Sequence, residues 1–558
     1  MTESSNLRTG AQILVDQLRI HGVDTAFCVP GESYLATLDA LYDVRDALKL
    51  IVCRQEGGVT YMGDAYGKIT GKPGICFVTR GPGATNASLG IHTAHQDSSP
   101  VILFIGQVGR AMMQREAFQE VDFRQMYAPL CKWVAQINDP ARIPEMVARA
   151  FHVATSGRPG PVVLALPEDM QKQQAAADDA KPYQTINPAP DPASITRLKE
   201  MLSAAKKPMM ILGGSGWNAE GLRQIRKFYE AWNLPVAAAF RRQDLIDNRH
   251  PNYAGDFGLG VNPALAKRVD EADLLFVLGA QMSEIITGGY ELFTLPCPHQ
   301  NFVHVTAGLD EVARVYQPDL GINSGMDNFA AAVSDLAPDG APGWSDWTAA
   351  ANADHKANIS PPDMKGPVDL GLIVQWLGET LPDDAIVTNG AGNFSNWVHR
   401  FYCYRDYPTQ LAPQSGSMGY GVPSAVAAQV AHPDRIVVSF SGDGDFLMCG
   451  QEIATARQYD LPITFVVVNN GTYGTIRMHQ ERFYPTRVSG TDLVNPDFCA
   501  LAKAYGLHGE LVEATDDFAP AFERCRASGG PALIEVRIDQ DQISPRATIT
   551  GLRRAAKG

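Results

Sequence analysis

The chain has 558 residues, of which 45% are hydrophobic and 19% charged, and its formal net charge is −14. This composition is typical of a globular protein with several buried cores, and it excludes a disordered or collagen-like chain. The acidic balance argues against a nucleic-acid or anionic-membrane binder, because both need clustered Lys and Arg.

The cysteines and the N-terminus indicate a compartment. The nine cysteines contain no CxxC pair, which favours reduced thiols over a disulfide framework. We recognise neither a signal peptide nor a run of about 18 apolar residues that would cross a membrane. The sequence therefore predicts a cytoplasmic protein.

Two polar, Pro-containing stretches, 171–194 and 336–367, read as linkers. They predict domains at 1–175, 190–335 and 365–545. Each block alternates short apolar runs such as VILFIGQ, DLLFVLGA and ITFVVVNN with amphipathic stretches. Continuous Val, Ile, Leu and Phe runs are typical of parallel strands buried on both faces. We therefore predict an α/β protein of three doubly wound parallel-sheet domains.

In the first block, Glu56 directly follows an apolar run and opens a predicted helix. A structural role is one interpretation, because the helix dipole favours a glutamate at this position. His92 and His95 lie on a later helix, where they are either packed or surface histidines or proton carriers. Ser33 receives no role.

In the central block, the turn Gly213-Gly-Ser-Gly216 follows the apolar run MMIL. Such a turn occurs in nucleotide-binding folds, but alone it is weak evidence. We expect this domain to be mainly structural. Arg241 and Arg242 remain candidate contacts for a flavin or another nucleotide.

The third block carries the most specific pattern. The apolar run 436–440 ends at Ser441-Gly-Asp-Gly-Asp445, a helical stretch continues to about Tyr459, and the run 463–468 ends at Asn469-Asn470. A helix of about 14 residues travels roughly 21 Å, and the next strand returns a similar distance. Asp443 and Asn470 should therefore meet at one sheet edge. Carboxylate, amide and carbonyl oxygens suit Mg²⁺, and the glycines suit a diphosphate at a helix N-terminus.

This GDG and NN arrangement resembles the thiamine diphosphate (ThDP) motif. The resemblance implies that Mg²⁺ is bound by Asp443, the Asn470 side chain and the Thr472 carbonyl. Met418 falls where the family places the apolar residue that bends the cofactor. The cofactor-binding residues implied by the resemblance are Gly390, Ala391, Gly392, Asn393, Gly416, Met418, Gly442, Asp443, Gly444, Asp445, Asn470, Thr472, Tyr473 and Gly474.

The first block resembles the pyrimidine-binding domain of acetohydroxyacid (acetolactate) synthases, through RQEGG, GKPGICFVTRGPGATNASLG, EAFQEVD and ATSGRPGPVVLALPEDM. The similarity extends through essentially the whole chain. It implies pyrimidine-binding, central and diphosphate-binding domains. It also implies that Glu56 activates the cofactor through its aminopyrimidine. In that family two subunits build each site, so a homodimer or homotetramer with active sites at the interface is expected.

The substrate side matches the family only partly. Phe118 and Gln119 match the family's FQE, and the implied catalytic residues are Glu56, Phe118, Gln119, Met418 and His479. However, Gly57 stands in place of a glutamine, Glu168 in place of a lysine, and His479 in place of the tryptophan that selects a larger acceptor. These departures put a branched-chain biosynthetic role in doubt.

The resemblance implies a ThDP- and Mg²⁺-dependent carboligase or decarboxylase acting on a 2-oxo acid. One alternative is a FAD-dependent enzyme of the pyruvate oxidase type. Flavin is disfavoured, because the segment 281–288 lacks both arginines of the flavin-binding members. A ThDP lyase acting on another 2-oxo or 2-hydroxyacyl substrate is a further alternative. An inactive regulatory paralogue is the least favoured, since Glu56, Asp443 and Asn470 are all present.

Overall fold

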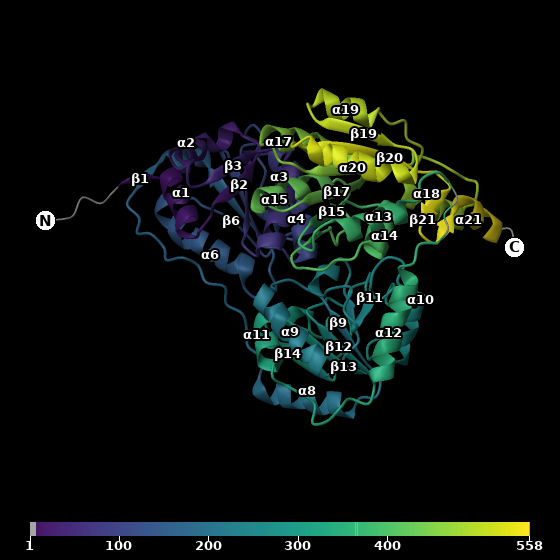
Figure 1. Cartoon of the computed structure of the whole chain (residues 1–558). Coiled ribbons are helices and arrows are strands. Elements are labelled where there is room, and N and C mark those ends of the chain that lie inside the picture. The colour runs from purple at the N-terminus through teal and green to yellow at the C-terminus, as the bar shows by residue number, and fades with distance from the viewer. Residues whose placement is uncertain (1–6, 363, 365, 557–558) are drawn as a thin grey trace. The chain divides into compact units, whose positions relative to one another are not determined.

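Three six-stranded parallel sheets organise the chain in a computed structural model that describes residues 7–362, 364 and 366–556 (Figure 1). The chain forms two compact units. The first comprises residues up to Ile186 together with Val426–Ala431 and Cys449–Tyr459, and the second comprises the rest. Three parallel sheets with flanking helices confirm the predicted fold class.

The first unit holds a sheet with the strand order β3-β2-β4-β5-β7-β6, in which every neighbouring pair is parallel. Its strands are β2 (Thr25–Cys28), β3 (Lys49–Val52), β4 (Gly74–Val78), β5 (Val101–Gln107), β6 (Trp133–Gln136) and β7 (Pro161–Pro167). Its helices are α1 (Gly10–Ile20), α2 (Leu35–Asp43), α3 (Glu56–Thr70), α4 (Pro82–Asp97), α5 (Phe123–Tyr127), α6 (Ile143–Thr155) and α7 (Glu168–Lys172). Strands β1 (Arg8–Thr9) and β8 (Gln174–Ala175) form a separate antiparallel pair. β4, β5 and β7 are buried along their whole length, as expected for central parallel strands.

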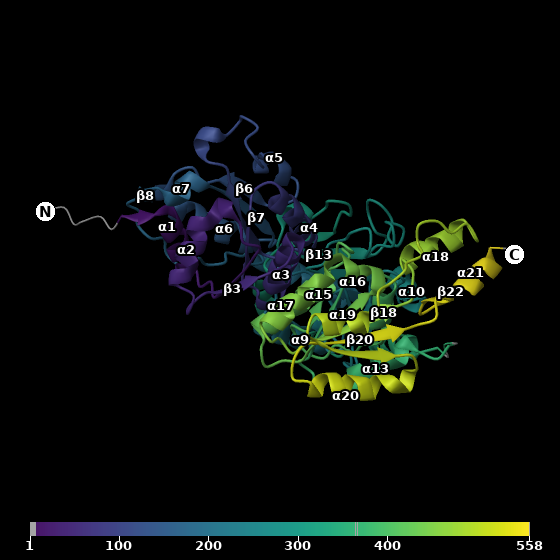
Figure 2. The same ribbon diagram turned by 90° about the horizontal axis from the view of Figure 1, so that it is seen from above.

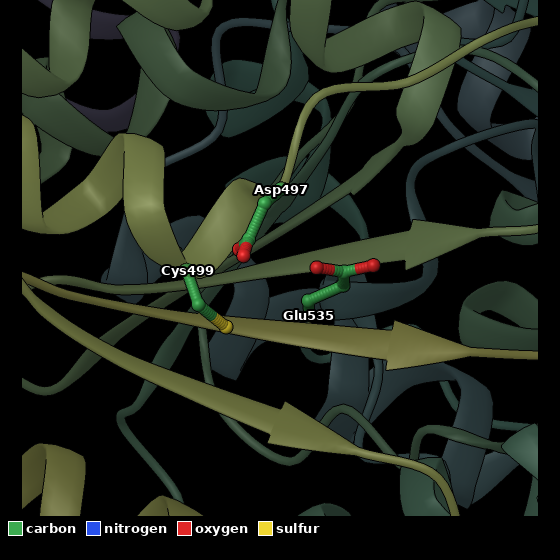
Figure 3. A group of neighbouring side chains, drawn as sticks. All are labelled: Asp497, Cys499 and Glu535. Atoms are coloured by element: carbon green, nitrogen blue, oxygen red, sulfur yellow. The ribbon is translucent and has the colours of Figure 1, made fainter.

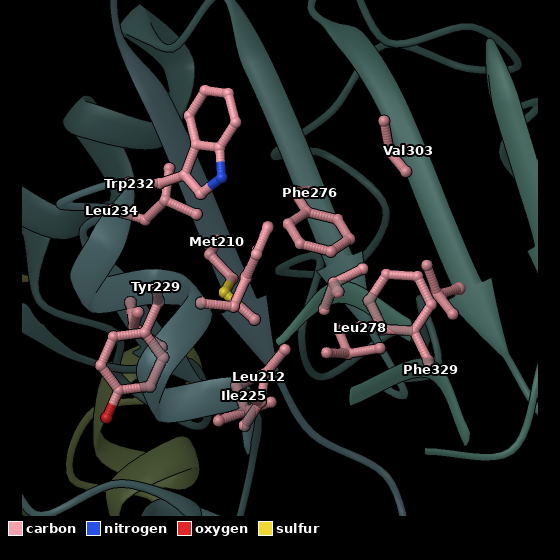
Figure 4. Close-up of a cluster of buried hydrophobic side chains, with 14 of the residues drawn as sticks. Met210, Leu212, Ile225, Tyr229, Trp232, Leu234, Phe276, Leu278, Val303 and Phe329 are labelled. Atoms are coloured by element: carbon pink, nitrogen blue, oxygen red, sulfur yellow. The ribbon is translucent and has the colours of Figure 1, made fainter. Parts of the chain in front are cut away.

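The central sheet, in the second unit, has the order β11-β10-β9-β12-β13-β14. Its strands are β9 (Pro208–Leu212), β10 (Val236–Ala238), β11 (Tyr253–Asp256), β12 (Leu274–Leu278), β13 (Asn301–Thr306) and β14 (Leu320–Asn323). Its helices are α8 (Pro192–Ala204), α9 (Ala219–Ala231), α10 (Pro263–Glu271), α11 (Met326–Val333) and α12 (Ser345–Asn358). Helices α9 and α11 cover one face through a core that includes Met210, Trp232, Phe276 and Phe329 (Figure 4).

The third sheet, also in the second unit, has the order β16-β15-β17-β18-β20-β19, with all neighbours parallel. Its strands are β15 (Ile386–Asn389), β16 (Gln410–Leu411), β17 (Val437–Gly442), β18 (Thr464–Asn469), β19 (His508–Val512) and β20 (Ala532–Arg537). The remaining elements are α13 (Leu370–Thr380), α14 (Phe394–Phe401), α15 (Gly421–Ala431), α16 (Asp443–Cys449), α17 (Ile453–Gln458), α18 (Gly474–Phe483), α19 (Phe498–Ala504), α20 (Phe518–Ala527), β21 (Gln542–Ser544), β22 (Ala547–Thr548) and α21 (Ile549–Ala555). Helices α13, α14 and α20 share one core with the strands. Figure 2 shows α13 and α20 on the same side of the sheet.

The stretch after the GDG residues differs from the prediction. We predicted one helix to about Tyr459, but α16 ends at Cys449, and a 3₁₀ turn at Gly450–Glu452 precedes α17. The turn places the buried Glu452 carboxylate where it accepts from the backbone N–H groups of Arg54 (2.9 Å) and Gln55 (3.0 Å). A continuous helix would not present this side chain in the same way, so the break has a local structural reason. Among the described helices, no stretch is both long and apolar enough to cross a membrane.

Candidate active site

The ends of β17 and β18 bring the GDG and NN segments together. Gly442 pairs with Val468 across these strands, so Asp443 begins α16 beside the loop that follows β18. The Gly471 N–H donates to Asp443 Oδ2 at 2.8 Å. The predicted meeting of the two segments at one sheet edge is therefore observed.

Asp443 is held as an ordered acceptor. The carboxylate is buried, at 3% exposure. Its Oδ1 accepts from the Gly444 N–H (2.9 Å), and its Oδ2 also accepts from Asn495 Nδ2 (2.7 Å). Burial raises the pKa of Asp443, while the hydrogen bonds oppose that rise. A bound cation would restore the charged form at this position.

The loop after β18 is fixed by its own hydrogen bonds. Asn470 Oδ1 accepts from the Thr472 N–H at 3.2 Å, and the Thr472 hydroxyl donates to the Thr491 carbonyl at 2.8 Å. The Tyr473 N–H donates to the same carbonyl at 2.9 Å. Asn470 and Thr472 therefore lie in an ordered turn next to Asp443.

Asp445 ties two further loops to the same edge. Its Oδ1 accepts from the N–H groups of Ala391 (3.0 Å) and Gly419 (2.8 Å). Burial raises the pKa of this carboxyl to about 6. A Cβ added at Gly390 would lie 2.1 Å from a carboxylate oxygen of Asp445, so only glycine fits there. The loop at 390–393 is thus packed directly on the GDG segment.

The other predicted cofactor residues surround this edge. Asn393 Nδ2 donates to the Ile543 carbonyl at 2.7 Å, next to Gly474 at the start of α18. A Cβ at Gly444 would lie 2.5 Å from the Tyr473 ring, and one at Gly442 2.9 Å from Phe394. Gly416 has a φ of 65° and is exposed, while Gly392 and Met418 are half-buried.

These residues fit a magnesium-bound diphosphate by the chemistry of the donors. Asp443, Asn470 and Thr472 offer oxygen ligands, which Mg²⁺ prefers. Gly442 and Gly444 add no side chain of their own at the N-terminus of α16, a position where backbone N–H groups favour an anion. The assignment of individual residues to the metal and the diphosphate stays a prediction.

Glu56 lies in the first unit at the first position of α3. The helix is capped by Gln55, whose side-chain oxygen accepts from the Gly58 N–H at 3.0 Å. Glu56 Oε2 accepts from Asn86 Nδ2 of α4 at 3.0 Å. A Cβ at Gly83 would lie 3.2 Å from Glu56 Oε1. The carboxylate is therefore oriented by one amide and is only partly buried.

The predicted substrate residues Phe118 and Gln119 lie on a loop over the start of α4. Gln119 has a φ of 64°, and a Cβ at Gly81 would lie 2.7 Å from the Gln119 Cβ. The Phe118 side chain is 73% exposed, while its carbonyl accepts from Arg80 Nε at 3.3 Å. The Arg80 side chain thus holds the loop through the Phe118 carbonyl, while the phenyl ring stays exposed.

Arg80 explains the unusual Glu168. The Arg80 guanidinium pairs with Glu168 (3.4 Å) and Glu32 (3.0 Å). Ser33 Oγ lies 2.8 Å from Thr79 Oγ1 and accepts from the Arg80 N–H at 3.3 Å. Glu168 therefore pairs with the Arg80 cation. The Ser33 hydroxyl contacts Thr79 and Arg80 and so supports the segment after β4 that carries Arg80.

The three candidate histidines lie on α4 and α18. His479 is exposed on α18, and its ring stacks on Phe483 with centroids 6.1 Å apart. His92 is exposed on α4, and His95 is half-buried on the same helix.

Several structural partners were missed by sequence reasoning. Asn86 contacts Glu56, Asn495 contacts Asp443, and Glu452 holds the entrance to α3. Asn86 lies in the GPGATN motif, which could have indicated it. Asn495 lies 52 residues after Asp443 in a segment without periodicity, so nothing in the sequence pattern indicated it.

A second group of metal-ligand side chains comprises Asp497, Cys499 and Glu535, whose candidate ligand atoms lie within 4.8 Å of one another (Figure 3). Asp497 already caps α19 by accepting from the Ala500 N–H at 2.8 Å. Glu535 Oε1 already accepts from Arg537 Nε at 2.8 Å. Burial raises the pKa of the Cys499 thiol to about 11. Two of the three groups thus have local structural roles, and we assign no metal here.

Comparison with protein-family models identifies the family of the chain. The N-terminal TPP binding domain of the thiamine pyrophosphate enzymes matches residues 8–126, the central domain matches 195–333, and the C-terminal TPP binding domain matches 390–536. The chain belongs to the thiamine pyrophosphate enzyme family. Glu56 lies in the N-terminal match, and Asp443 and Asn470 lie in the C-terminal match. The family resemblance noted in the sequence is thereby confirmed.

Similar proteins are acetolactate synthases. The chain is 33% identical over 537 residues to the acetolactate synthase isozyme 2 large subunit of Escherichia coli (strain K12), covering 95% of this chain and 96% of the relative. It is 33% identical over 551 residues to the acetolactate synthase large subunit of Parasynechococcus marenigrum (strain WH8102), covering 95% and 87%. The corresponding protein of Pyropia yezoensis is 30% identical over 552 residues, covering 96% and 93%. The chain is therefore a ThDP-dependent enzyme with acetolactate synthase relatives.

Proposed function

We propose that the protein is a ThDP- and Mg²⁺-dependent carboligase or decarboxylase that acts on 2-oxo acids, similar to acetolactate synthases. The observation that carries the proposal is the Glu56 carboxylate at the head of α3, oriented by Asn86 at 3.0 Å. The family match supplies the cofactor, and the relatives supply the substrate class. An inactive paralogue would not need this oriented carboxylate.

The chain's residues would divide the work between two clusters. Asp443, Asn470 and the Thr472 carbonyl would hold Mg²⁺, and the N-terminus of α16 would hold the diphosphate. Glu56 would share a proton with the aminopyrimidine ring nitrogen of the cofactor, as a positioned acid or base. When bound, ThDP supplies the electron sink that decarboxylation of a 2-oxo acid requires.

The acceptor side would differ from that of a branched-chain biosynthetic enzyme. The family's lysine would place a cation at position 168. Here Glu168 stands at that position and forms an ion pair with Arg80. Phe118, at 73% exposure, is available to line the substrate. His479 brings an imidazole where a tryptophan would supply apolar contact. These features favour a small or polar acceptor.

Flavin oxidation remains the second candidate, because buried arginines follow β10. Arg242 Nη2 donates to Ser215 Oγ at 2.7 Å in the glycine-rich turn after β9, and the Arg241 side chain donates to the Pro413 carbonyl. Both contacts are made to the protein itself, which supports a structural role. A visible absorption spectrum of the purified protein separates the two, because bound flavin absorbs in the visible range.

A panel of 2-oxo acids with ThDP and Mg²⁺ tests the proposal. We expect CO₂ release from pyruvate or a related 2-oxo acid, with a 2-hydroxy-2-acyl or aldehyde product identified by mass spectrometry. Release should require both ThDP and Mg²⁺. No CO₂ from any 2-oxo acid at saturating cofactor would contradict the proposed function.

A further inference from the structure

Asn495 holds the predicted metal-binding carboxylate in place. Its Nδ2 donates to Asp443 Oδ2 at 2.7 Å and to Asn469 Oδ1 at 2.9 Å. The Gly471 N–H donates to the same two oxygens, at 2.8 Å and 3.1 Å. Asp443 Oδ2 and Asn469 Oδ1 therefore share both donors. This arrangement keeps Oδ2 occupied by the protein and fixes the plane of the Asp443 carboxylate.

The orientation of the Asn469 amide is set from the next strand. Asn469 Nδ2 donates to Glu535 Oε1 at 2.9 Å, and the same oxygen accepts from Arg537 Nε at 2.8 Å. Glu535 lies on β20 and is 1% exposed. An ionised carboxylate only accepts hydrogen bonds. Asn469 must therefore turn its nitrogen toward Glu535 and its oxygen toward Asn495.

This orientation passes on to Asn495. Because Asn469 presents an oxygen, the Asn495 amide must present its nitrogen, and that nitrogen also meets Asp443. The segment is held locally, since Pro496 restricts the preceding residue to extended backbone and the Leu493 N–H donates to the Gly471 carbonyl at 2.9 Å. Each amide in the row thus has one allowed orientation.

We propose that Asn495 is a positioning residue for the Mg²⁺ ligand Asp443, with Asn469 and Glu535 as the row of groups that fixes its orientation. The inference deepens the proposed function and rests on its metal assignment. In this role Asn495 acts through Asp443, to which its Nδ2 donates. It keeps one oxygen of Asp443 engaged, so that the carboxylate offers its other oxygen to the metal in a fixed direction.

The expected effect follows from how outer partners act on metal ligands. Removing a group that orients a ligand typically weakens metal affinity or activity by about 10–100-fold. In Asn495→Ala, Asp443 keeps the Gly471 and Gly444 donors but loses the side chain that fixes its plane. We therefore expect the Mg²⁺ concentration for half-maximal ThDP binding to rise about 10–100-fold. Turnover at saturating Mg²⁺ should recover most of the native value, because Glu56 is unchanged.

The test is a Mg²⁺ titration of ThDP binding, followed by calorimetry, on the full chain. Asn495→Leu serves as a second variant, because its side chain has a similar shape and no polar atoms. Asp443→Ala marks the full loss of the site. Asp497→Ala is the matched control: it removes the cap of α19 from the same segment but leaves the contact to Asp443 intact. We expect the control to stay within twofold of the native Mg²⁺ requirement.

Three results would overturn the proposal. One is a Mg²⁺ requirement within twofold of native in both Asn495 variants. Another is an equal rise in Asp497→Ala, which would show general loosening of the segment. ThDP binding by the native protein that needs no Mg²⁺ would also overturn it. If the native protein binds Mg²⁺ and ThDP but converts no 2-oxo acid, the proposed function fails while the role of Asn495 stands.

Discussion

His479 is the residue on which acceptor choice is expected to depend. It is exposed on α18 and stacks only on Phe483 among the ring contacts described for it. An imidazole is smaller and more polar than the tryptophan found in the family, so a filled apolar pocket is not expected here. Even a good pocket discriminates one methylene by about 1–3 kcal/mol.

We therefore predict little preference between pyruvate and 2-oxobutyrate as acceptor. Competition between the two, followed as the ratio of the two carboligation products, should give a ratio within about tenfold, below the roughly 10–200-fold preference that a methylene-selective pocket reaches. His479→Trp should shift the ratio toward the 2-oxobutyrate product. A strong native bias toward that product would show that His479 lies outside the acceptor pocket.

Single residues also show what the sequence could predict. Asp443 and Asn470 are predicted to meet at one sheet edge, because both follow buried parallel strands. The hydrogen bond of 2.8 Å from the next residue, Gly471, to Asp443 shows that the two segments lie together. Asn495 was not expected, because it lies in an irregular segment where neither periodicity nor a turn motif specifies contacts. In the sequence, Glu168 is notable only because it stands where the family has a lysine. Its partner Arg80 can be identified only from the folded structure.

At the scale of elements, the packing of α3 on α4 sets the position of Glu56. Thr60 Oγ1 of α3 donates to the Ala87 carbonyl of α4 at 2.9 Å. A Cβ at Gly90 would lie 2.3 Å from Thr60 Oγ1 and 2.6 Å from its backbone carbon. The two helices approach so closely that no side chain fits between them at this point.

Gly90→Ala should therefore destabilise the protein. Alanine in a helix gains about 1 kcal/mol over glycine, but overpacking a close contact costs about 1–3 kcal/mol, and backbone atoms cannot rotate away. We expect a lower melting temperature by calorimetry. Gly340→Ala, where the added Cβ would have no described heavy atom within 4 Å, is the control and should melt as the native protein does. Equal melting of both variants would contradict the packing account.

The C-terminal helix α21 is joined to α18 by a buried carboxylate. Glu481, whose side chain is 0% exposed, pairs with Arg553 (2.7 Å) and Arg477 (3.0 Å). Figures 1 and 2 both show α18 beside α21. The Arg553 hydrogen bonds lower the pKa of Glu481 to about 2. The folded-state pKa thus lies below the unfolded value of about 4.3.

This pair predicts an acid dependence. Its stabilisation is complete above the unfolded pKa and is lost as the pH falls from about 4 toward 2. Glu481→Gln should lower the free energy of unfolding by about 1.5–3 kcal/mol at neutral pH, since hydrogen bonds to charged groups have that strength. It should also flatten the melting temperature over this acid range. Glu200→Gln, at an exposed pair with Arg197, should change the stability by less than about 1 kcal/mol. An unchanged acid profile in Glu481→Gln would contradict the assignment.

The elements that were not predicted share a cause. The long central strands were evident as continuous apolar runs. Strands β6, β11, β14, β16 and β19 were not singled out, and each is near a sheet edge and short or partly exposed. Edge strands need less apolar surface, so their sequences resemble loops. The break between α16 and α17 depends on the contacts of Glu452, which no local pattern reveals.

At the scale of the whole molecule, the sequence predicts an assembly of two or more subunits. Glu56 lies in one unit and Asp443 in the other, and the family resemblance implies that two subunits complete each site. Large apolar side chains are exposed around the GDG segment and α18, at Leu447 (48%), Met448 (48%), Ile476 (55%) and Phe483 (64%). Exposed apolar side chains of this size are candidates for burial in a contact between subunits.

We therefore predict a homodimer or homotetramer. Light scattering at micromolar concentration should give at least twice the chain mass of 60.4 kDa. Replacing Ile476 and Phe483 by Asp should lower the oligomer mass and the activity together, while each monomer stays folded by circular dichroism. A fully active monomer of the native chain would contradict an active site at a subunit interface.

The central claim is that Glu56 activates ThDP for turnover of a 2-oxo acid. Glu56→Gln tests it most directly, because the amide keeps the size of the side chain but cannot exchange the proton. ThDP affinity by calorimetry should stay within a few-fold of native, since Asp443 and its loop are untouched. CO₂ release at saturating ThDP and Mg²⁺ should fall by about 100-fold or more. Turnover close to native under these conditions would contradict the account.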